Sequence, residues 1–181
     1  MSRSKPVPTS PTTTPVGAGR VLVAGVGYQN LRDLSAGLLV HERLARGDHL
    51  GDRVDVEDLS YGPIDVLFLL QRRAPYAAAV FVTGSKRDRV PGTVELRRWD
   101  FPAIAPDALQ ERIVEGVTGV ISLDNLLHIC GHFGALPAEV TVVEVEPADD
   151  GWGEGTSEAG GRAVDEATAA VRAEVMRLLS A

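Results

Sequence analysis

Hydrophobic and polar positions along the chain follow two periods, one typical of buried strands and one typical of amphipathic helices. Apolar runs and strict alternation predict strands over residues 21–26, 54–59, 77–82, 94–98 and 140–145. Helical spacing of apolar residues predicts helices over residues 34–44, 64–71, 107–114, 122–129 and 162–179. Strands that alternate with helices are typical of an α/β three-layer sandwich with a mostly parallel sheet, here with 94–98 as an antiparallel edge strand.

Two segments lack either period. Residues 1–19 are rich in Pro, Ser and Thr, with two basic residues and no acid, which predicts a disordered N-terminal tail. Residues 149–161 are acidic and glycine-rich, which predicts a mobile loop, and the sequence leaves open whether 149–158 closes over a cleft. The remaining length suits one core, so we expect residues 20–181 to form a single domain.

The composition of the chain excludes several classes of function. The net charge is −7, and the basic runs at 72–73 and 86–89 are short, so we expect them to be solvated and expect no nucleic-acid partner. Cys130 is the only cysteine, which excludes an internal disulfide and a cysteine-based zinc site. No apolar stretch approaches membrane-spanning length, and residues 1–19 lack the apolar core of a signal peptide. We therefore expect a cytoplasmic protein without a membrane partner.

The end of the first predicted strand and the loop that follows it contain two glycines, Gly25 and Gly27. They resemble half of a dinucleotide fingerprint, but Asn30 stands in place of the third glycine and the bulky Tyr28 follows the second. A pyrophosphate site is therefore disfavoured, and we expect the glycines to serve the turn itself.

Polar residues follow three strands that should end at one edge of the sheet: Asp33, Asp58 and Thr83. Two carboxylates placed there could act as general acid and base, which makes Asp33 and Asp58 candidate catalytic residues. The structural alternative is that Asp33 caps the first helix and that Asp58 ties down a loop. For Asp33 we favour the structural alternative.

A second polar group lies on the helix predicted from residue 122. Asp124, His128 and His132 recur every four residues and would share a face of one helix, which suggests a weak candidate metal site. Gly131 should end that helix, so the alternative is an ordinary capped helix end. Cys130 between the histidines could be a nucleophile, but its apolar neighbours predict a small core residue.

Four stretches in the same order and spacing resemble the hydrogenase maturation protease family, whose members trim the carboxyl tail of the nickel–iron hydrogenase large subunit. The resemblance runs from about Arg20 to Leu179, and its carriers are residues 25–37, 56–58, 80–94 and 137–147. It implies a twisted sheet of five or so strands between helices. It also implies a partner, the C-terminal tail of the large-subunit precursor, and a metal, the nickel that this substrate already holds.

The family offers three metal ligands: an acid just after the aspartate of the first loop, an aspartate ending the third strand, and a histidine before the helix that precedes the last strand. Carboxylate and imidazole suit nickel. The resemblance places these ligands at Leu34, at Thr83 (or at Val82 if the following gap is placed differently) and near Gly119. A small shift moves the last position to 120–122, which also holds no histidine. The family's second-strand acid matches Asp58.

Three hypotheses follow from these substitutions. The first is a non-catalytic assembly or tail-binding factor that holds no tightly bound cofactor. The second is an active metal-dependent endopeptidase that uses substrate nickel and shifted ligands, and the third is an unrelated small-molecule enzyme on the same scaffold. We rank the first slightly above the second, so enzymatic activity stays uncertain. The expected peptide-binding cleft comprises Gly25, Gly27, Asn30, Asp33, Leu34, Asp58 and Thr83.

Overall fold

A computed structural model describes residues 19–47, 50–73 and 75–180. The predicted disordered tail therefore lies, apart from Gly19, outside the described residues. Within the described ranges, no helix is both long and apolar enough to cross a membrane.

The predicted sheet is present and has five strands. They are β1 (Val21–Val26), β2 (Val54–Asp58), β3 (Ala78–Gly84), β4 (Val94–Arg98) and β5 (Glu139–Val145). Their order is β2-β1-β3-β5-β4; β4 pairs antiparallel with β5 at one edge, and the other pairs are parallel. The chain moves from β1 to one side for β2 and to the other for β3. A ligand crevice is expected at this reversal, outside the carboxyl ends of β1 and β3.

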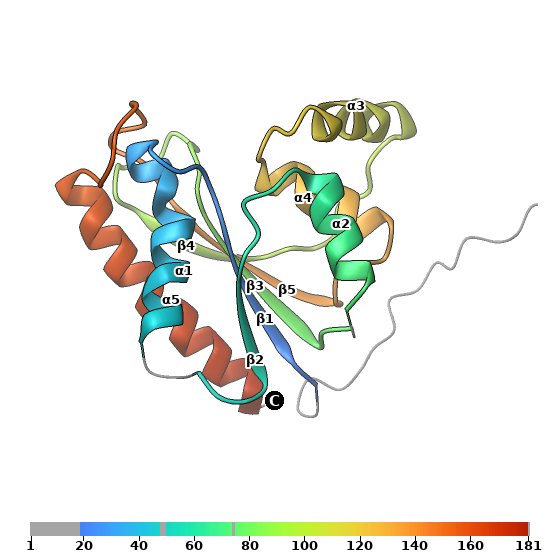
Figure 1. Cartoon of the computed structure of the whole chain (residues 1–181), viewed down its shortest axis with the longest axis horizontal. Helices are drawn as coiled ribbons and strands as arrows, with labels where there is room; N and C mark the ends of the chain where they lie inside the picture. The colour runs from blue at the N-terminus through green and yellow to red at the C-terminus, as the bar shows by residue number, and fades with distance from the viewer. Residues whose placement is uncertain (1–18, 48–49, 74, 181) are drawn as a thin grey trace, which may run out of the picture.

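Helices cover both faces of the sheet, as the three-layer prediction requires. The helices are α1 (Ala36–Arg46), α2 (Pro63–Gln71), α3 (Pro106–Val117), α4 (Leu123–His132) and α5 (Glu158–Ser180). Helices α1 and α5 lie on one face, α2 and α4 on the other, and α3 lies outside α2 and α4 (Figure 1). Each face has its own apolar cluster, one beneath α2 and α4 around Phe81 and one beneath α1 and α5 around Val80.

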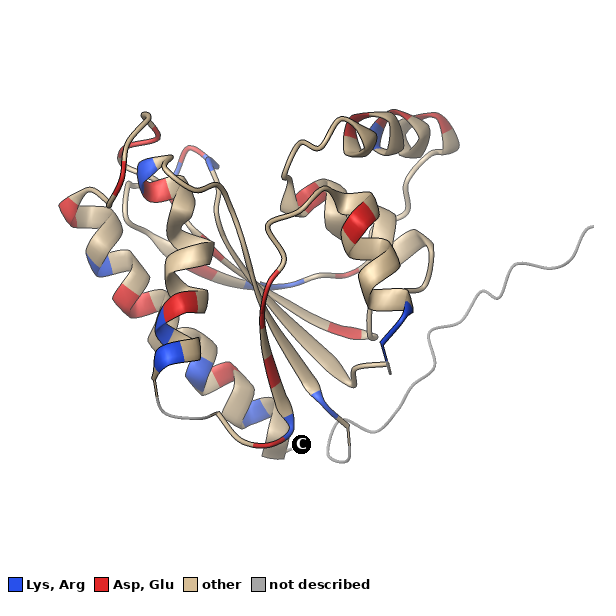
Figure 2. Ribbon diagram, viewed as in Figure 1, with Lys and Arg blue, Asp and Glu red and all other residues tan. Residues whose placement is uncertain are grey.

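Charged residues of both signs are interspersed along α1 and α5 (Figure 2). The apolar stripe of α5 predicted from the sequence is buried, and it consists of Val164, Ala167, Val171, Val175 and Leu178. The mixed charge on the outer faces is consistent with the expectation that phosphate backbones are poor partners.

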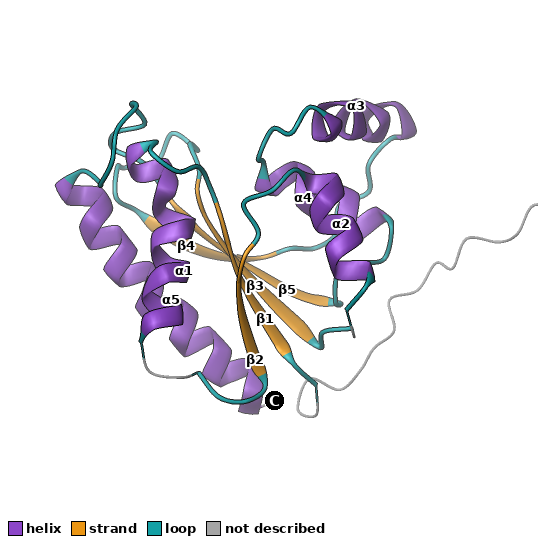
Figure 3. Cartoon of the chain, in the orientation of Figure 1, coloured by secondary structure: helices purple, strands orange, loops and turns teal. Residues whose placement is uncertain are grey.

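Several element boundaries differ from those predicted (Figure 3). A 3₁₀ turn, Arg32–Ser35, precedes α1, so the first helix begins at Ala36 rather than at residue 34. Strand β3 continues through Thr83 to Gly84, and α5 begins at Glu158 inside the predicted loop. Ser122 caps α4 as predicted, because its hydroxyl accepts a hydrogen bond from the Asn125 amide at 3.3 Å.

Candidate functional site

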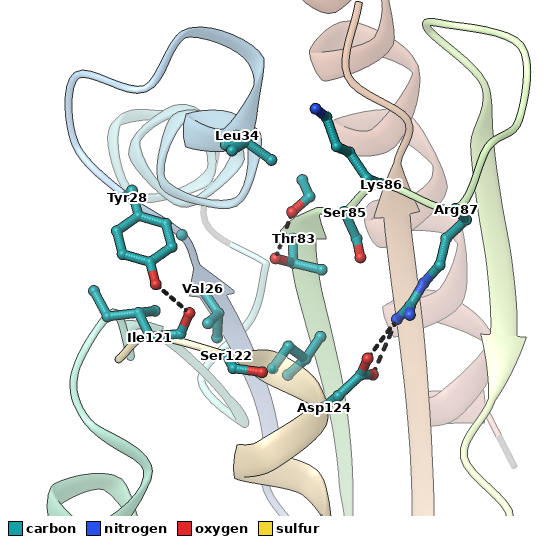
Figure 4. Close-up of a pocket in the computed structure, with 13 residues that line it drawn as sticks. Val26, Tyr28, Leu34, Thr83, Ser85, Lys86, Arg87, Ile121, Ser122 and Asp124 are labelled. Carbon is teal, nitrogen blue, oxygen red and sulfur yellow. Dashed lines mark hydrogen bonds and ion pairs between the residues drawn. The ribbon is translucent and has the colours of Figure 1, made fainter. Parts of the chain in front are cut away.

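A cavity of about 250 Å³ lies at the point where the strand order reverses. We call it the switch-point cavity. It is lined by the end of β1 and its loop, the 3₁₀ turn, the end of β3 and the start of α4 (Figure 4). Its lining residues are Val26, Gly27, Tyr28, Leu34, Thr83, Gly84, Ser85, Lys86, Arg87, Ile121, Ser122, Leu123 and Asp124.

Hydrogen bonds between distant segments fix the cavity wall. The Tyr28 hydroxyl donates to the Ile121 carbonyl at 2.7 Å, which joins the first loop to the segment before α4 (Figure 4). On the other side, the Gly27 amide donates to Ser60 Oγ at 3.1 Å. The Ser60 amide in turn donates to Asp58 Oδ1 at 2.9 Å. Asp58 therefore orders a loop, as its structural alternative predicted, and it is not among the cavity-lining residues.

Leu34 and Thr83 line this one cavity together. Register explains their proximity, since Thr83 pairs with Val26 at the end of β1, from which the loop carrying Leu34 departs. The Thr83 hydroxyl donates to the Gly84 carbonyl at 3.2 Å. Among the three positions named by the resemblance, Gly119 does not line the cavity, whereas the neighbouring Ile121 and Ser122 do.

Asp33 is fully buried, and it points away from the cavity toward the start of α5. Its carboxylate accepts from the amides of Ala148, Asp149 and Ser157 at 2.9, 3.0 and 2.8 Å, and from the Ser157 hydroxyl at 2.7 Å. Burial alone would raise the pKa of Asp33, but these donors outweigh it and hold the pKa below its ordinary value. The prediction that Asp33 caps the first helix is wrong. Its carboxylate instead accepts hydrogen bonds from Ser157, just before the amino-terminal end of α5.

The acidic, glycine-rich loop is hydrogen-bonded to the first loop at several points along its length. Besides the bonds to Asp33, the Gly153 amide donates to the Asn30 carbonyl at 2.8 Å, and the Arg32 amide donates to the Gly153 carbonyl at 3.3 Å. Gly160 lets α5 approach closely, since a Cβ atom there would lie 2.1 Å from Asp33 Oδ1. A carboxylate beside a helix amino terminus is stabilised by the helix dipole.

Other residues of the expected cleft lie outside the cavity. Gly25 faces α1, where a Cβ atom would lie 2.3 Å from the Gly37 carbonyl oxygen, so this glycine permits strand–helix packing. Asn30 is exposed and has a left-handed backbone with φ of 58°, which asparagine tolerates well. Of the seven residues expected to form the cleft, the structure places Gly27, Leu34 and Thr83 on the cavity wall.

The basic run at 86–89 is not simply solvated. Arg87 and Arg89 donate to the side chain of Glu144, which is 2 % exposed, at 2.8 and 3.1 Å, and Arg97 joins them at 3.0 Å. Arg87 also binds both oxygens of Asp124 at the cavity wall (Figure 4). Burial would raise the pKa of Glu144, but these arginines outweigh it and lower the pKa. The feature of the sequence that could have indicated this ion-pair cluster is Glu144, a charged residue within a predicted apolar strand.

Asp124, His128 and His132 do not form a metal site. Within residues 19–47, 50–73 and 75–180, no group of three or more His, Cys, Asp or Glu side chains is placed to hold a metal ion. The His128 ring packs edge-on against Trp99, with 4.9 Å between centroids. Cys130 is fully buried, and burial raises the pKa of its thiol to about 12, which confirms a core residue rather than a nucleophile.

Several solved structures with the same fold are hydrogenase maturation peptidases. A hydrogenase 2 maturation peptidase from a Thaumarchaeota archaeon is 25% identical, with a TM-score of 0.60 over 86% of this chain and 97% of its own. The Escherichia coli hydrogenase maturating endopeptidase HybD is 22% identical, with a TM-score of 0.63 over 87% and 93%. An Escherichia coli endopeptidase is 23% identical, with a TM-score of 0.66 over 84% and 89%.

Comparison by sequence finds no matching family model and no matching curated protein. The fold of these solved structures nevertheless agrees with the resemblance seen in four stretches of the sequence.

Proposed function

We propose that this chain, which belongs by its fold with the hydrogenase maturation proteases, acts in the maturation of a nickel–iron hydrogenase large subunit. In this proposal a single domain spanning residues 20–181 binds the C-terminal tail of the large-subunit precursor in the cytoplasm. It does so as a non-catalytic assembly factor. The names of the structural neighbours support the partner, and the chemistry of the switch-point cavity supports the absence of cleavage.

The observation that carries the proposal is that Leu34 and Thr83 both line the switch-point cavity. The cavity lies where the resemblance places the metal, yet one of these side chains is aliphatic and the other is a hydroxyl. Asp124 is the one carboxylate among the lining residues, and both its oxygens are bound by Arg87. Such a wall is suited to backbone and side-chain contacts with a peptide and offers a divalent metal few ligands.

The alternative of an active endopeptidase would require shifted ligands. Asp33 is the nearest acid in sequence, but its carboxylate already accepts four hydrogen bonds from the 148–157 segment. His128 packs against Trp99 and is not among the residues lining the switch-point cavity. The contacts of both side chains therefore favour the binding role.

Binding of the tail is tested with the full chain and a nickel-loaded large-subunit precursor immobilised for biolayer interferometry. We expect saturable binding to the precursor and loss of binding to a matched precursor that ends at the processing site. Equal binding to both precursors would contradict recognition of the tail.

Restoring carboxylates should create a metal site where none is present among the described residues. We expect the double variant Leu34→Glu/Thr83→Asp to bind Ni²⁺ in isothermal titration calorimetry, because both side chains line one cavity and carboxylates are suitable ligands. The wild type should show no saturable heat. The matched control, Leu96→Glu/Val114→Glu, places two carboxylates on exposed positions of β4 and α3 and should also show none.

A further inference from the structure

A second cavity, of about 580 Å³, adjoins the switch-point cavity and shares Arg87 and Asp124 with it. We call it the arginine groove. It runs between β4 and α4, and its wall includes Arg97 and Trp99 on one side and Asp124 and His128 on the other. The proposed function assigns this groove no role.

Strand geometry explains why the groove is charged. Alternate residues of a strand point to the same face, so Glu95, Arg97 and Trp99 lie together. Trp99 joins the apolar cluster beneath α2 and α4, which identifies this face. Asp124 and His128 are four residues apart on α4 and face the same groove. The groove therefore follows α4 outward from the switch-point cavity toward the edge strand.

Two arginines in the groove keep hydrogen-bond donors available. Arg97 forms ion pairs through Nη2 alone, with Glu144 at 3.0 Å and with Asp124 at 3.8 Å, and it lies over Trp99, with 5.6 Å from the guanidinium carbon to the ring centroid. Arg112, on α3, donates to Asn125 Oδ1, and among the described residues it has no carboxylate within ion-pair distance. A guanidinium has five N–H donors, so both side chains can still receive a carboxylate.

The far end of the groove is apolar. A cavity of about 300 Å³ shares Trp99, Pro102 and His128 with the arginine groove and adds Phe101, Ile104 and Leu127. Phe101 is 38% exposed and has a positive φ of 49°, a costly conformation for an aromatic residue. Because 38% of Phe101 is exposed, its side chain is accessible from this pocket.

We infer that the arginine groove binds an acidic peptide segment, with a carboxylate held by Arg97 and Arg112 and an apolar side chain inserted beside Phe101. The inference rests on the proposed function, because it takes this segment to be part of the precursor's tail. It extends the binding surface beyond the switch-point cavity and names the chemistry of the segment that is recognised.

Charge favours a peptide over a nucleic acid in this groove. Four arginines and three carboxylates line the groove, so its formal charge is +1, whereas the whole chain carries −7. The closely spaced phosphates of a nucleic acid would be repelled by Glu95 and Asp124 in the groove. They would also be repelled by the net negative charge of the rest of the chain. An isolated carboxylate needs only the donors of Arg97 and Arg112.

The test uses fluorescein-Gly-Ser-Gly-Leu-Glu-Glu with a free carboxyl end, and fluorescence anisotropy with the full chain. We expect saturable binding to the wild type and affinity about tenfold weaker for Arg112→Gln, since a charge-assisted hydrogen bond is lost. Phe101→Asn should weaken binding similarly, and asparagine tolerates the positive φ. Arg98→Gln, a matched change on the opposite face of β4, should bind as the wild type does.

Two results would overturn the inference: equal affinity of Arg112→Gln and wild type, or equal binding of a peptide with Lys-Lys in place of Glu-Glu. Arg112→Lys, which keeps the charge, should retain part of the affinity and controls for folding. The precursor is titrated in parallel. If the precursor binds wild type and Arg112→Gln equally, the inference about the arginine groove is wrong while the proposed function stands. If the peptide binds but the precursor does not, the proposed function fails.

Discussion

Replacing Asp33 by asparagine should lower the free energy of unfolding by about 2 to 4 kcal/mol. The asparagine side chain keeps the shape of aspartate. Its NH₂ group, however, must face N–H or O–H donors whose hydrogen bonds a carboxylate oxygen accepts in the wild type. Oδ2 accepts from the Ala148 and Asp149 amides and from the Ser157 hydroxyl, and Oδ1 accepts from the Ser157 amide, so at least one backbone donor loses its acceptor in either orientation of the amide. Urea unfolding followed by circular dichroism measures the loss. Asp165→Asn, an exposed carboxylate on α5, serves as the control and should change stability little.

The effect of Asp33 should depend on pH in a defined direction. Its folded pKa lies below its ordinary value, so its contribution to stability is complete above the unfolded pKa of about 4. The contribution is lost as pH falls through the lowered folded pKa. The difference in stability between wild type and Asp33→Asn should therefore be constant near neutrality and shrink below about pH 4. A difference that grows on acidification would contradict this role.

Replacing Glu144 by glutamine should destabilise the fold by about 3 kcal/mol. The side chain is 2% exposed and pairs with Arg87, Arg89 and Arg97, so the neutral variant leaves three guanidinium groups without their shared buried carboxylate. Urea unfolding gives the magnitude. The exposed Glu158→Gln should stay within about 0.5 kcal/mol of wild type. Equal stability of Glu144→Gln and wild type would mean that the arginines do not depend on this carboxylate.

Much of the fold follows from local pattern. Uniformly apolar runs such as 21–26 and alternating runs such as 94–98 are sufficient to place strands and to identify the antiparallel edge. Ser122 was also predictable as a cap because capping depends on neighbouring residues. The start of α1 was not, since the 3₁₀ turn before it depends on Asp33 meeting a segment more than a hundred residues later.

The site was only partly predictable for the same reason. Alignment with the resembling family was enough to bring Leu34 and Thr83 to one place, because the first and third strands are adjacent in that fold. Arg87 follows Thr83 closely in sequence, but its side-chain position, like that of Arg97, depends on an ion pair with Glu144 on β5. Loop composition likewise gave no sign that Asp33 would bind the 148–157 segment.

The central proposal, that the switch-point cavity binds the precursor's tail without cutting it, is tested most directly by intact-mass spectrometry. A nickel-loaded large-subunit precursor is incubated with the purified chain, and its mass is compared with that of untreated precursor. Because Leu34 and Thr83 stand together on the cavity wall, we expect complex formation and an unchanged precursor mass. A precursor shortened by its C-terminal tail, with cleavage at the processing site, would contradict the proposal.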